Sequence, residues 1–206
     1  MSWRRLIACL VLGASIGCAD GGQRGTGISS FEGNVVAVQR GAAEPSSSVS
    51  GIVVRVEGTS LQAETDAAGS FTLRGTFGGD TALRFQRASD GLDVRYSVNA
   101  PAGGTTTLHD VTVRTDTGEA SPAAVYVDFE GRVVTPDCED ERLLCESAAS
   151  SAADDDTYVV LLADSTVHDS AGHPVGCDAF QPGDLMHVHG AYTEDGTIGA
   201  ADVTRR

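Results

Sequence analysis

The sequence predicts an all-β fold built from two consecutive modules. Helical periodicity is nearly absent from the 206 residues. Short runs rich in Val, Thr, Leu and Phe recur instead, and clusters of Gly, Asp, Asn and Ser separate them. Runs of this kind fill two regions on either side of a short polar stretch. We therefore expect a β-sandwich followed by a small β-barrel.

Composition sets the limits on function. Hydrophobic residues make up 41% of the chain, which is too apolar for a fully disordered protein. The 14 basic residues are all Arg and face 29 Asp and Glu, for a net charge of −15. Because binding to phosphate backbones needs a basic surface, we expect no nucleic-acid partner.

The N-terminus predicts an export signal over residues 1–17. Arg4 and Arg5 form a positive start, and Leu6–Leu12 form an apolar stretch that is too short to cross a bilayer. The sequence Ser15-Ile-Gly-Cys18 resembles a bacterial lipobox, which implies that Cys18 is lipidated. Ordinary signal-peptide cleavage near this point is the alternative.

A lipidated Cys18 would place the protein in the bacterial cell envelope, held to a membrane through its lipid and not by a spanning segment. The anchor could lie in the outer membrane, on its periplasmic side or at the cell surface. Residues 18–31 are Gly-rich and polar, which predicts a flexible tether between anchor and fold.

The first module is predicted over residues 32–116. Alternation places Leu83 and Phe85 on one face of a strand and Arg84 on the other. Asp66-Ala-Ala-Gly69 has the composition of a tight turn and is expected to form a hairpin tip, followed by an inward Phe71. The expected strands are 33–39, 51–57, 61–65, 70–74, 81–87, 92–98 and 105–114.

The segment around that turn carries a family resemblance. Thr65, Asp66, Gly69 and Phe71 match the Thr-Asp-x-x-Gly-x-Phe pattern of carboxypeptidase regulatory-like domains. The resemblance covers about residues 32–116 and implies a transthyretin-like, Greek-key β-sandwich. It also implies an accessory module without catalytic residues, of a kind found in secreted and surface proteins.

Residues 117–123 are predicted to be a linker, and residues 124–206 a second module. Its expected strands are 125–135, 157–163, 166–169, 184–192 and 196–203. An acidic insertion at 136–156 is expected to be a solvated loop, because its carboxylates lack the order of a calcium-binding loop.

The second module is similar to a bacterial domain-of-unknown-function family with an OB-like barrel. The resemblance implies fold, and no activity. Matching positions are Gly131, Val133, Thr166, Val167, Gly183, Asp184, Gly190, Asp195, Gly196, Ile198, Ala200 or Ala201, and Val203.

Cysteines suggest one internal disulfide, because an oxidising envelope favours such bonds. With Cys18 lipidated, Cys138, Cys145 and Cys177 remain. A bond between Cys138 and Cys145 would close a short loop, and pairing of either one with Cys177 is the rival.

Two histidines are candidate metal ligands because they are expected to share one face of a strand. His187 and His189 lie two apart on a predicted strand, whose other face carries Met186 and Val188. They could jointly hold Zn²⁺ or Cu²⁺. Two exposed surface histidines without a metal are the alternative.

No enzyme signature is found, so we expect no catalytic residues and no cofactor. The sequence favours a non-catalytic structural, adhesive or binding accessory protein, with an envelope protein or glycan as partner. One alternative is an envelope metal-binding protein that uses His187 and His189. Another is a glycan- or peptidoglycan-associated binding protein.

Overall fold

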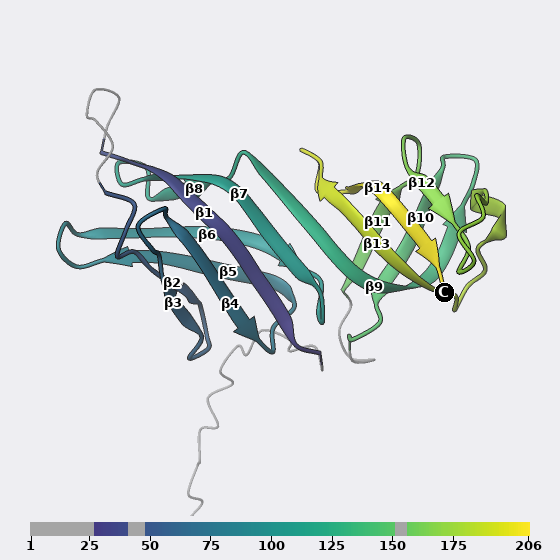
Figure 1. The fold of residues 1–206 in the computed structure, drawn as a ribbon, viewed down its shortest axis with the longest axis horizontal. Helices are drawn as coiled ribbons and strands as arrows, with labels where there is room; N and C mark the ends of the chain where they lie inside the picture. The colour runs from purple at the N-terminus through teal and green to yellow at the C-terminus, as the bar shows by residue number, and fades with distance from the viewer. Residues whose placement is uncertain (1–26, 41–47, 151–155) are drawn as a thin grey trace, which may run out of the picture.

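A computed structural model describes residues 27–40, 48–150 and 156–206. Strands form the regular structure of this part of the chain, apart from a short 3₁₀ helix, η1 (Cys177–Ala179). Two β bodies follow one another along the longest axis of the molecule (Figure 1). The predicted all-β fold is confirmed. The predicted signal peptide, Cys18 and most of the predicted tether lie outside the described residues.

The first body is a sandwich of two sheets. One sheet has the order β4-β1-β7 and the other β3-β2-β5-β6, with a shared apolar core between them. All seven predicted strands are present. They are β1 (Ser29–Gln39), β2 (Val53–Val56), β3 (Gln62–Glu64), β4 (Ser70–Gly75), β5 (Gly79–Arg87), β6 (Leu92–Ala100) and β7 (Thr105–Arg114).

The predicted alternation of apolar and polar residues identifies side chains of the sandwich core. Leu83 and Phe85 of β5 are fully buried, whereas Arg84 between them is exposed. Phe71 of β4 is buried too, and its ring meets that of Phe85 edge-on at 5.9 Å between centroids. Burying one such side chain stabilises the fold by about 1.5–3 kcal/mol, so these strands hold together mainly through this core.

The residues Asp66–Gly69 form the predicted turn, but this turn does not connect two paired strands as predicted. Asp66 Oδ1 accepts hydrogen bonds from the N–H groups of Ala68 (2.8 Å) and Ser70 (2.9 Å), and Gly69 has φ +80°. A Cβ on Gly69 would lie 2.1 Å from the Val35 carbonyl oxygen. However, β3 pairs with β2 and β4 pairs with β1, so the turn crosses from one sheet to the other and is not a hairpin tip.

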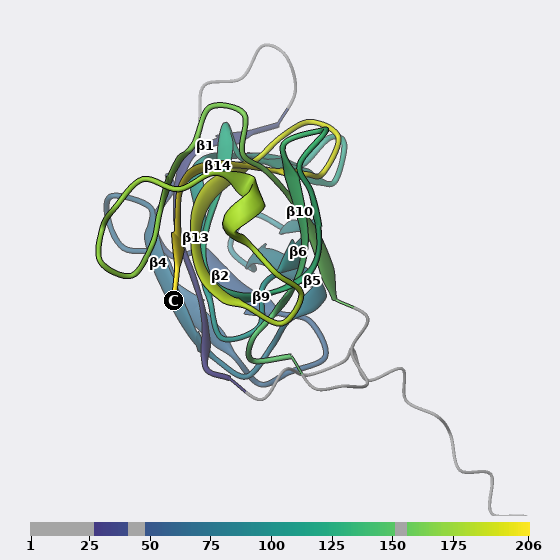
Figure 2. The same cartoon turned by 90° about the vertical axis from the view of Figure 1, so that its right-hand side faces the viewer.

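The second body is a small closed barrel, seen end-on in Figure 2. Its strands pair in the circuit β9-β10-β11-β14-β13 and back to β9, and β12 adds to the edge of β14. The strands are β9 (Ala124–Asp137), β10 (Arg142–Ser147), β11 (Thr157–Leu161), β12 (Thr166–His168), β13 (Leu185–Tyr192) and β14 (Ile198–Arg205).

Two strands lie where the sequence predicts none. The predicted linker contains β8 (Glu119–Ser121), which pairs with β7 and, at one position, with β6. The predicted acidic loop contains β10, whose Leu143 and Cys145 are fully buried in the barrel. The expectation of a solvated loop is therefore wrong for residues 142–147, because β10 is needed to close the barrel.

Strand β9 belongs to both bodies. Its first residues, 124–128, pair with β7 of the sandwich, and residues 131–137 pair along the same edge with β10. Its other edge pairs with β13 over residues 126–132. Val125 lies in the sandwich core and Val127 in the barrel core. The two bodies are thus joined by one uninterrupted strand.

Side-chain contacts reinforce this junction. The hydroxyl of Tyr158 in β11 donates to Asn99 Oδ1 (3.1 Å), and that of Tyr192 in β13 donates to the Asn99 carbonyl (2.5 Å). Ser147 donates to the carbonyl oxygen of Ala102. Burial raises the pKa of both tyrosines, so each keeps its proton and remains a donor.

Replacing Phe71 with Ala should lower the free energy of unfolding by about 3–5 kcal/mol, because burial is lost and a cavity remains. Thr72→Ala, at the neighbouring exposed position of β4, is the matched control and should change stability by under about 0.5 kcal/mol. Chemical denaturation of both variants measures the difference. Equal midpoints for Phe71→Ala and the unmodified protein would contradict the core described above.

Candidate functional site

The predicted histidine pair lies on the outer face of the barrel. His187 and His189 of β13 point away from the core, whereas Met186 and Val188 are fully buried. Both expectations about the two faces of this strand are therefore confirmed.

Strand β9 supplies carboxylates beside these histidines. Asp128 and Glu130 lie opposite His189 and His187 in the ladder. Glu130 Oε1 is 3.3 Å from His187 Nδ1, and the two Asp128 oxygens are 3.5 Å from His187 Nε2 and 3.4 Å from His189 Nδ1. Each imidazole can thus form an ion pair when it is protonated.

The arrangement does not provide a metal centre. In the part of the chain that the structure describes, no group of three or more His, Cys, Asp or Glu side chains is placed to hold a metal ion. The nitrogen–oxygen distances of 3.3–3.5 Å are those of ion pairs between ring and carboxylate. His187 and His189 therefore stay a predicted ligand pair, and the carboxylates beside them, Asp128 and Glu130, lie at ion-pair distance.

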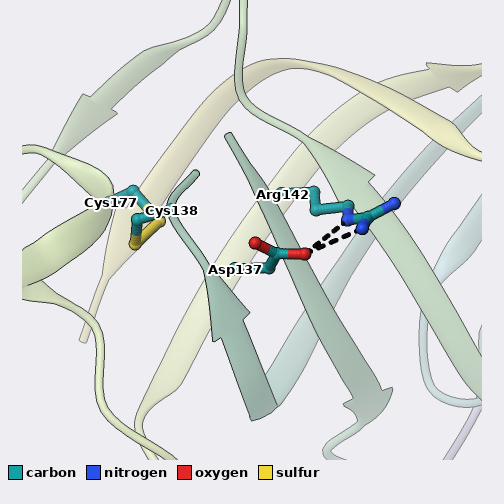
Figure 3. The surroundings of a disulfide bond; sticks show 4 residues. All are labelled: Asp137, Cys138, Arg142 and Cys177. Atoms are coloured by element: carbon teal, nitrogen blue, oxygen red, sulfur yellow. Dashed lines mark hydrogen bonds and ion pairs between the residues drawn. A yellow bond between two sulfur atoms is a disulfide. The ribbon is translucent and has the colours of Figure 1, made fainter. Parts of the chain in front are cut away.

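The disulfide joins Cys138 to Cys177, so the Cys138–Cys145 pairing is wrong and the rival pairing is present (Figure 3). Register explains the choice. Asp137 lies opposite Arg142 in the β9–β10 ladder, and Cys145 lies opposite Val133, well along the strand from Cys138. The disulfide attaches η1 to the end of β9, beside an ion pair between Arg142 and Asp137 (2.8 Å).

Cys145 is a free thiol inside the barrel core. Its Sγ contacts the Tyr158 carbonyl oxygen at 3.6 Å. Burial, with a smaller contribution from the charge of Glu146, raises the pKa of this thiol to about 12. A thiol that stays protonated and inaccessible is a poor nucleophile, so Cys145 is a packing residue.

A hollow lies on the sandwich, over the outer face of the sheet β3-β2-β5-β6. Its volume is about 630 Å³. It is open to solvent, and its lining mixes charged and amide side chains with glycine and aliphatic residues, without an aromatic side chain. The lining residues are Gly51, Val53, Arg55, Gln62, Gln86, Arg87, Ala88, Gly91, Leu92 and Asp93.

One end of this hollow is held rigid by an ion-pair cluster at the β5–β6 turn. Arg87 donates to both Asp90 oxygens (3.0 and 2.7 Å) and to the carbonyl groups of Ser48 and Ser50. Arg40 reaches Asp90 at 2.6 Å. Hydrogen bonding from Arg87, followed by that from Arg40, holds the pKa of Asp90 well below its usual range.

Local sequence motifs do not mark this hollow. Arg55 and Arg87 line it, and Arg84 and Arg95 lie on the same sheet outside its lining. Arg55, Arg84 and Arg95 are each the outward residue of a predicted strand, and that local signal was visible. Their proximity depends on which strands pair, and strand pairing is set by contacts between distant segments. The arginines therefore carried no recognisable motif.

Comparison with protein families finds no match, and neither does comparison with curated proteins. Two solved structures show partial likeness. One is a chain of a type II cohesin–X–dockerin complex from Acetivibrio cellulolyticus, with TM-score 0.32 and 19% identity over 42% of this chain and 56% of that chain. The other, from Bacteroides uniformis and proposed to bind carbohydrate, has TM-score 0.22 and 12% identity over 86% and 98%. At these TM-scores neither likeness bears on what this chain binds.

The described residues contain no helix of the length and hydrophobicity needed to cross a membrane.

Removal of the disulfide should destabilise the barrel. The double variant Cys138→Ser/Cys177→Ser should lose roughly 4 kcal/mol of stability, because opening a loop of this length increases the entropy of the unfolded chain. Mass spectrometry of non-reduced peptides from residues 19–206 should show a Cys138–Cys177 link, and Cys145 should react with alkylating reagents only after unfolding. A Cys138–Cys145 peptide would refute this assignment.

Asp90→Asn should lower stability near neutral pH by about 1.5–3 kcal/mol, because a nearly buried, charge-assisted hydrogen-bond cluster is lost. The folded pKa of Asp90 is lowered, so its contribution is present above the unfolded pKa of about 3.9 and falls as pH drops towards the folded pKa. The stability gap between variant and unmodified protein should therefore narrow below about pH 4. Asp93→Asn, whose ion pair is exposed, is the control and should show a smaller gap throughout. Denaturation at pH 3, 5 and 7 tests this.

Proposed function

We propose that this chain is a non-catalytic binding protein, lipid-anchored in the bacterial cell envelope, whose binding surface is the hollow on the sandwich. The observation that carries the proposal is an open hollow on a sheet face, lined by charged, amide and aliphatic side chains and bounded at one end by the Arg87–Asp90 ion pair. A preformed surface of this kind binds a ligand without first having to become ordered.

The pKa shifts support a non-catalytic role. Acid–base catalysis by a carboxyl, thiol or phenol group needs a pKa that is shifted towards neutrality. Among the described carboxyl, thiol and phenol groups, the resolved shifts are in the other direction: the pKa values of Asp90, Asp93, Asp169 and Asp195 are lowered, and those of Cys145 and three tyrosines are raised. The resemblance of residues 32–116 to carboxypeptidase regulatory-like domains, which lack catalytic residues, points the same way.

The envelope assignment rests on the N-terminal sequence and on the disulfide. Arg4, Arg5 and the lipobox-like sequence ending at Cys18 support export and lipidation. The Cys138–Cys177 disulfide suits an oxidising compartment. Nine residue steps separate Cys18 from Gly27, enough for a tether of at most about 30 Å.

The predicted tether reaches the described structure at the junction between the sandwich and the barrel. A Cβ on Gly27 would lie 2.7 Å from both the Gly103 Cα of the sandwich and the Ala149 Cβ that follows β10. The chain therefore enters between the two bodies. An anchor at Cys18 would leave the outer faces of both bodies within reach of envelope components.

Cys18→Ala should abolish lipidation and move the protein from the detergent phase to the aqueous phase, or leave it unprocessed. Detergent-phase partitioning of the two forms, followed by mass spectrometry of the N-terminus, measures this. Continued partitioning of the variant into detergent would contradict the anchor.

The binding surface has its own test. Saturable sedimentation of residues 19–206 with isolated cell envelopes is expected, and Gln86→Trp, which fills the hollow, should weaken it. Thr72→Trp, on the opposite sheet, is the matched control and should bind normally. Failure of the unmodified protein to bind envelopes, or equal effects of the two variants, would overturn the proposed surface.

A further inference from the structure

Three arginines form a row across the hollow-bearing sheet. In the ladders, Arg55 of β2 lies opposite Arg84 of β5, and Arg84 lies opposite Arg95 of β6. Gln62 of β3 and Glu119 of β8 close the row at its two ends. All five side chains are exposed on the same outer face. Residues directly opposite each other in a sheet have Cβ atoms only about 4.5–5.5 Å apart.

Like charges at such positions destabilise a sheet, and the carboxylates on this face are not shared evenly among the three arginines. Asp93 takes two hydrogen bonds from Arg84 (2.6 and 2.7 Å). Glu57 is shared, at 3.0 Å from Arg95 and 4.0 Å from Arg84.

Arg55 stands apart from these ion pairs. Among the described residues it donates to the neutral amide oxygen of Gln62 (3.1 Å), and no carboxylate lies within ion-pair distance of it. Its guanidinium lines the hollow. A planar cation with a neutral partner, at the rim of a preformed hollow, is suited to a carboxylate from outside the chain.

The charge of the whole chain makes this row unusual. Residues 124–206 hold 17 Asp and Glu against four Arg, whereas residues 32–116 hold ten against seven. Most of the negative charge therefore belongs to the barrel. An anion therefore meets less repulsion at the sandwich than at the barrel, and Arg55 is an exposed arginine there that pairs with no carboxylate among the described residues.

We propose that the arginine row binds an acidic polysaccharide, with a carboxylate of the glycan paired to Arg55. This inference rests on the proposed binding function of the hollow and adds its ligand class. An added carboxylate would give Arg55 a charged partner in place of the neutral amide of Gln62.

The lining favours a glycan over an acidic protein. Gln62 and Gln86 offer amide donors and acceptors for hydroxyl groups, and Gly51 and Gly91 leave the hollow open. Protein interfaces are instead enriched in aromatic residues and Met at their centres, and the hollow contains neither.

The test titrates the full chain, in mild detergent, with three probes: polygalacturonate, neutral dextran and polyglutamate. Binding to polygalacturonate that weakens with added salt is expected, with no binding to dextran and weaker binding to polyglutamate. Arg55→Gln should reduce affinity for polygalacturonate about tenfold, the effect of losing one hydrogen-bonded charge pair. Arg74→Gln, an exposed position on the other sheet, is the matched control and should bind normally.

The results that would contradict the proposal are as follows. Absence of polygalacturonate binding, equal loss in Arg55→Gln and Arg74→Gln, or equal binding to polyglutamate would overturn the assignment. An unchanged melting temperature for Arg55→Gln excludes misfolding as the cause of lost binding. If envelopes are still bound while polygalacturonate is not, this inference fails and the proposed function stands; if neither is bound, both fail.

Discussion

Strand β9 is the constraint on which the rest of the structure depends, because its alternation must satisfy two cores at once. Val125 faces the sandwich core, and Val127, Phe129 and Val133 face the barrel core. The side-chain period of a strand is two, so a slip of one residue would turn the apolar residues of both bodies towards solvent. The register of β9 therefore fixes the sandwich and the barrel relative to each other, and the contacts of Asn99 with Tyr158 and Tyr192 depend on that placement.

Local patterns predicted the strands well, because alternation and turn chemistry are properties of neighbouring residues. These local patterns gave wrong predictions where the residue types of a segment suit both a strand and a loop. In β10, only Leu143 and Cys145 reach the core, and the acidic residues around them suggest a solvated loop. At Asp66–Gly69 the turn itself was predictable, but the partners of β3 and β4 were not. Those partners are chosen by packing between distant segments.

The candidate sites show the same limit. The outward direction of His187 and His189 followed from their spacing, whereas the carboxylates beside them come from β9 and required the fold. The disulfide depended on the β9–β10 register, which carries Cys145 inward and leaves Cys138 near Cys177. The alternation of side chains along a strand predicts which face of the sheet a residue is on. Its neighbours on other strands can be known only once the strand order is known.

Charge is divided between the two bodies in a way that bears on binding. At physiological ionic strength, exposed charges are largely screened beyond about 8 Å, so the acidic barrel does not cancel the local field of the arginine row. At longer range and lower salt the barrel repels a polyanion, which leaves the sandwich face as the approach with least repulsion. Because β9 holds the two bodies in one orientation, the difference in charge between the barrel surface and the sandwich face is a fixed property of the molecule. An anionic chain on the arginine row would therefore lie across the strands β2, β5 and β6.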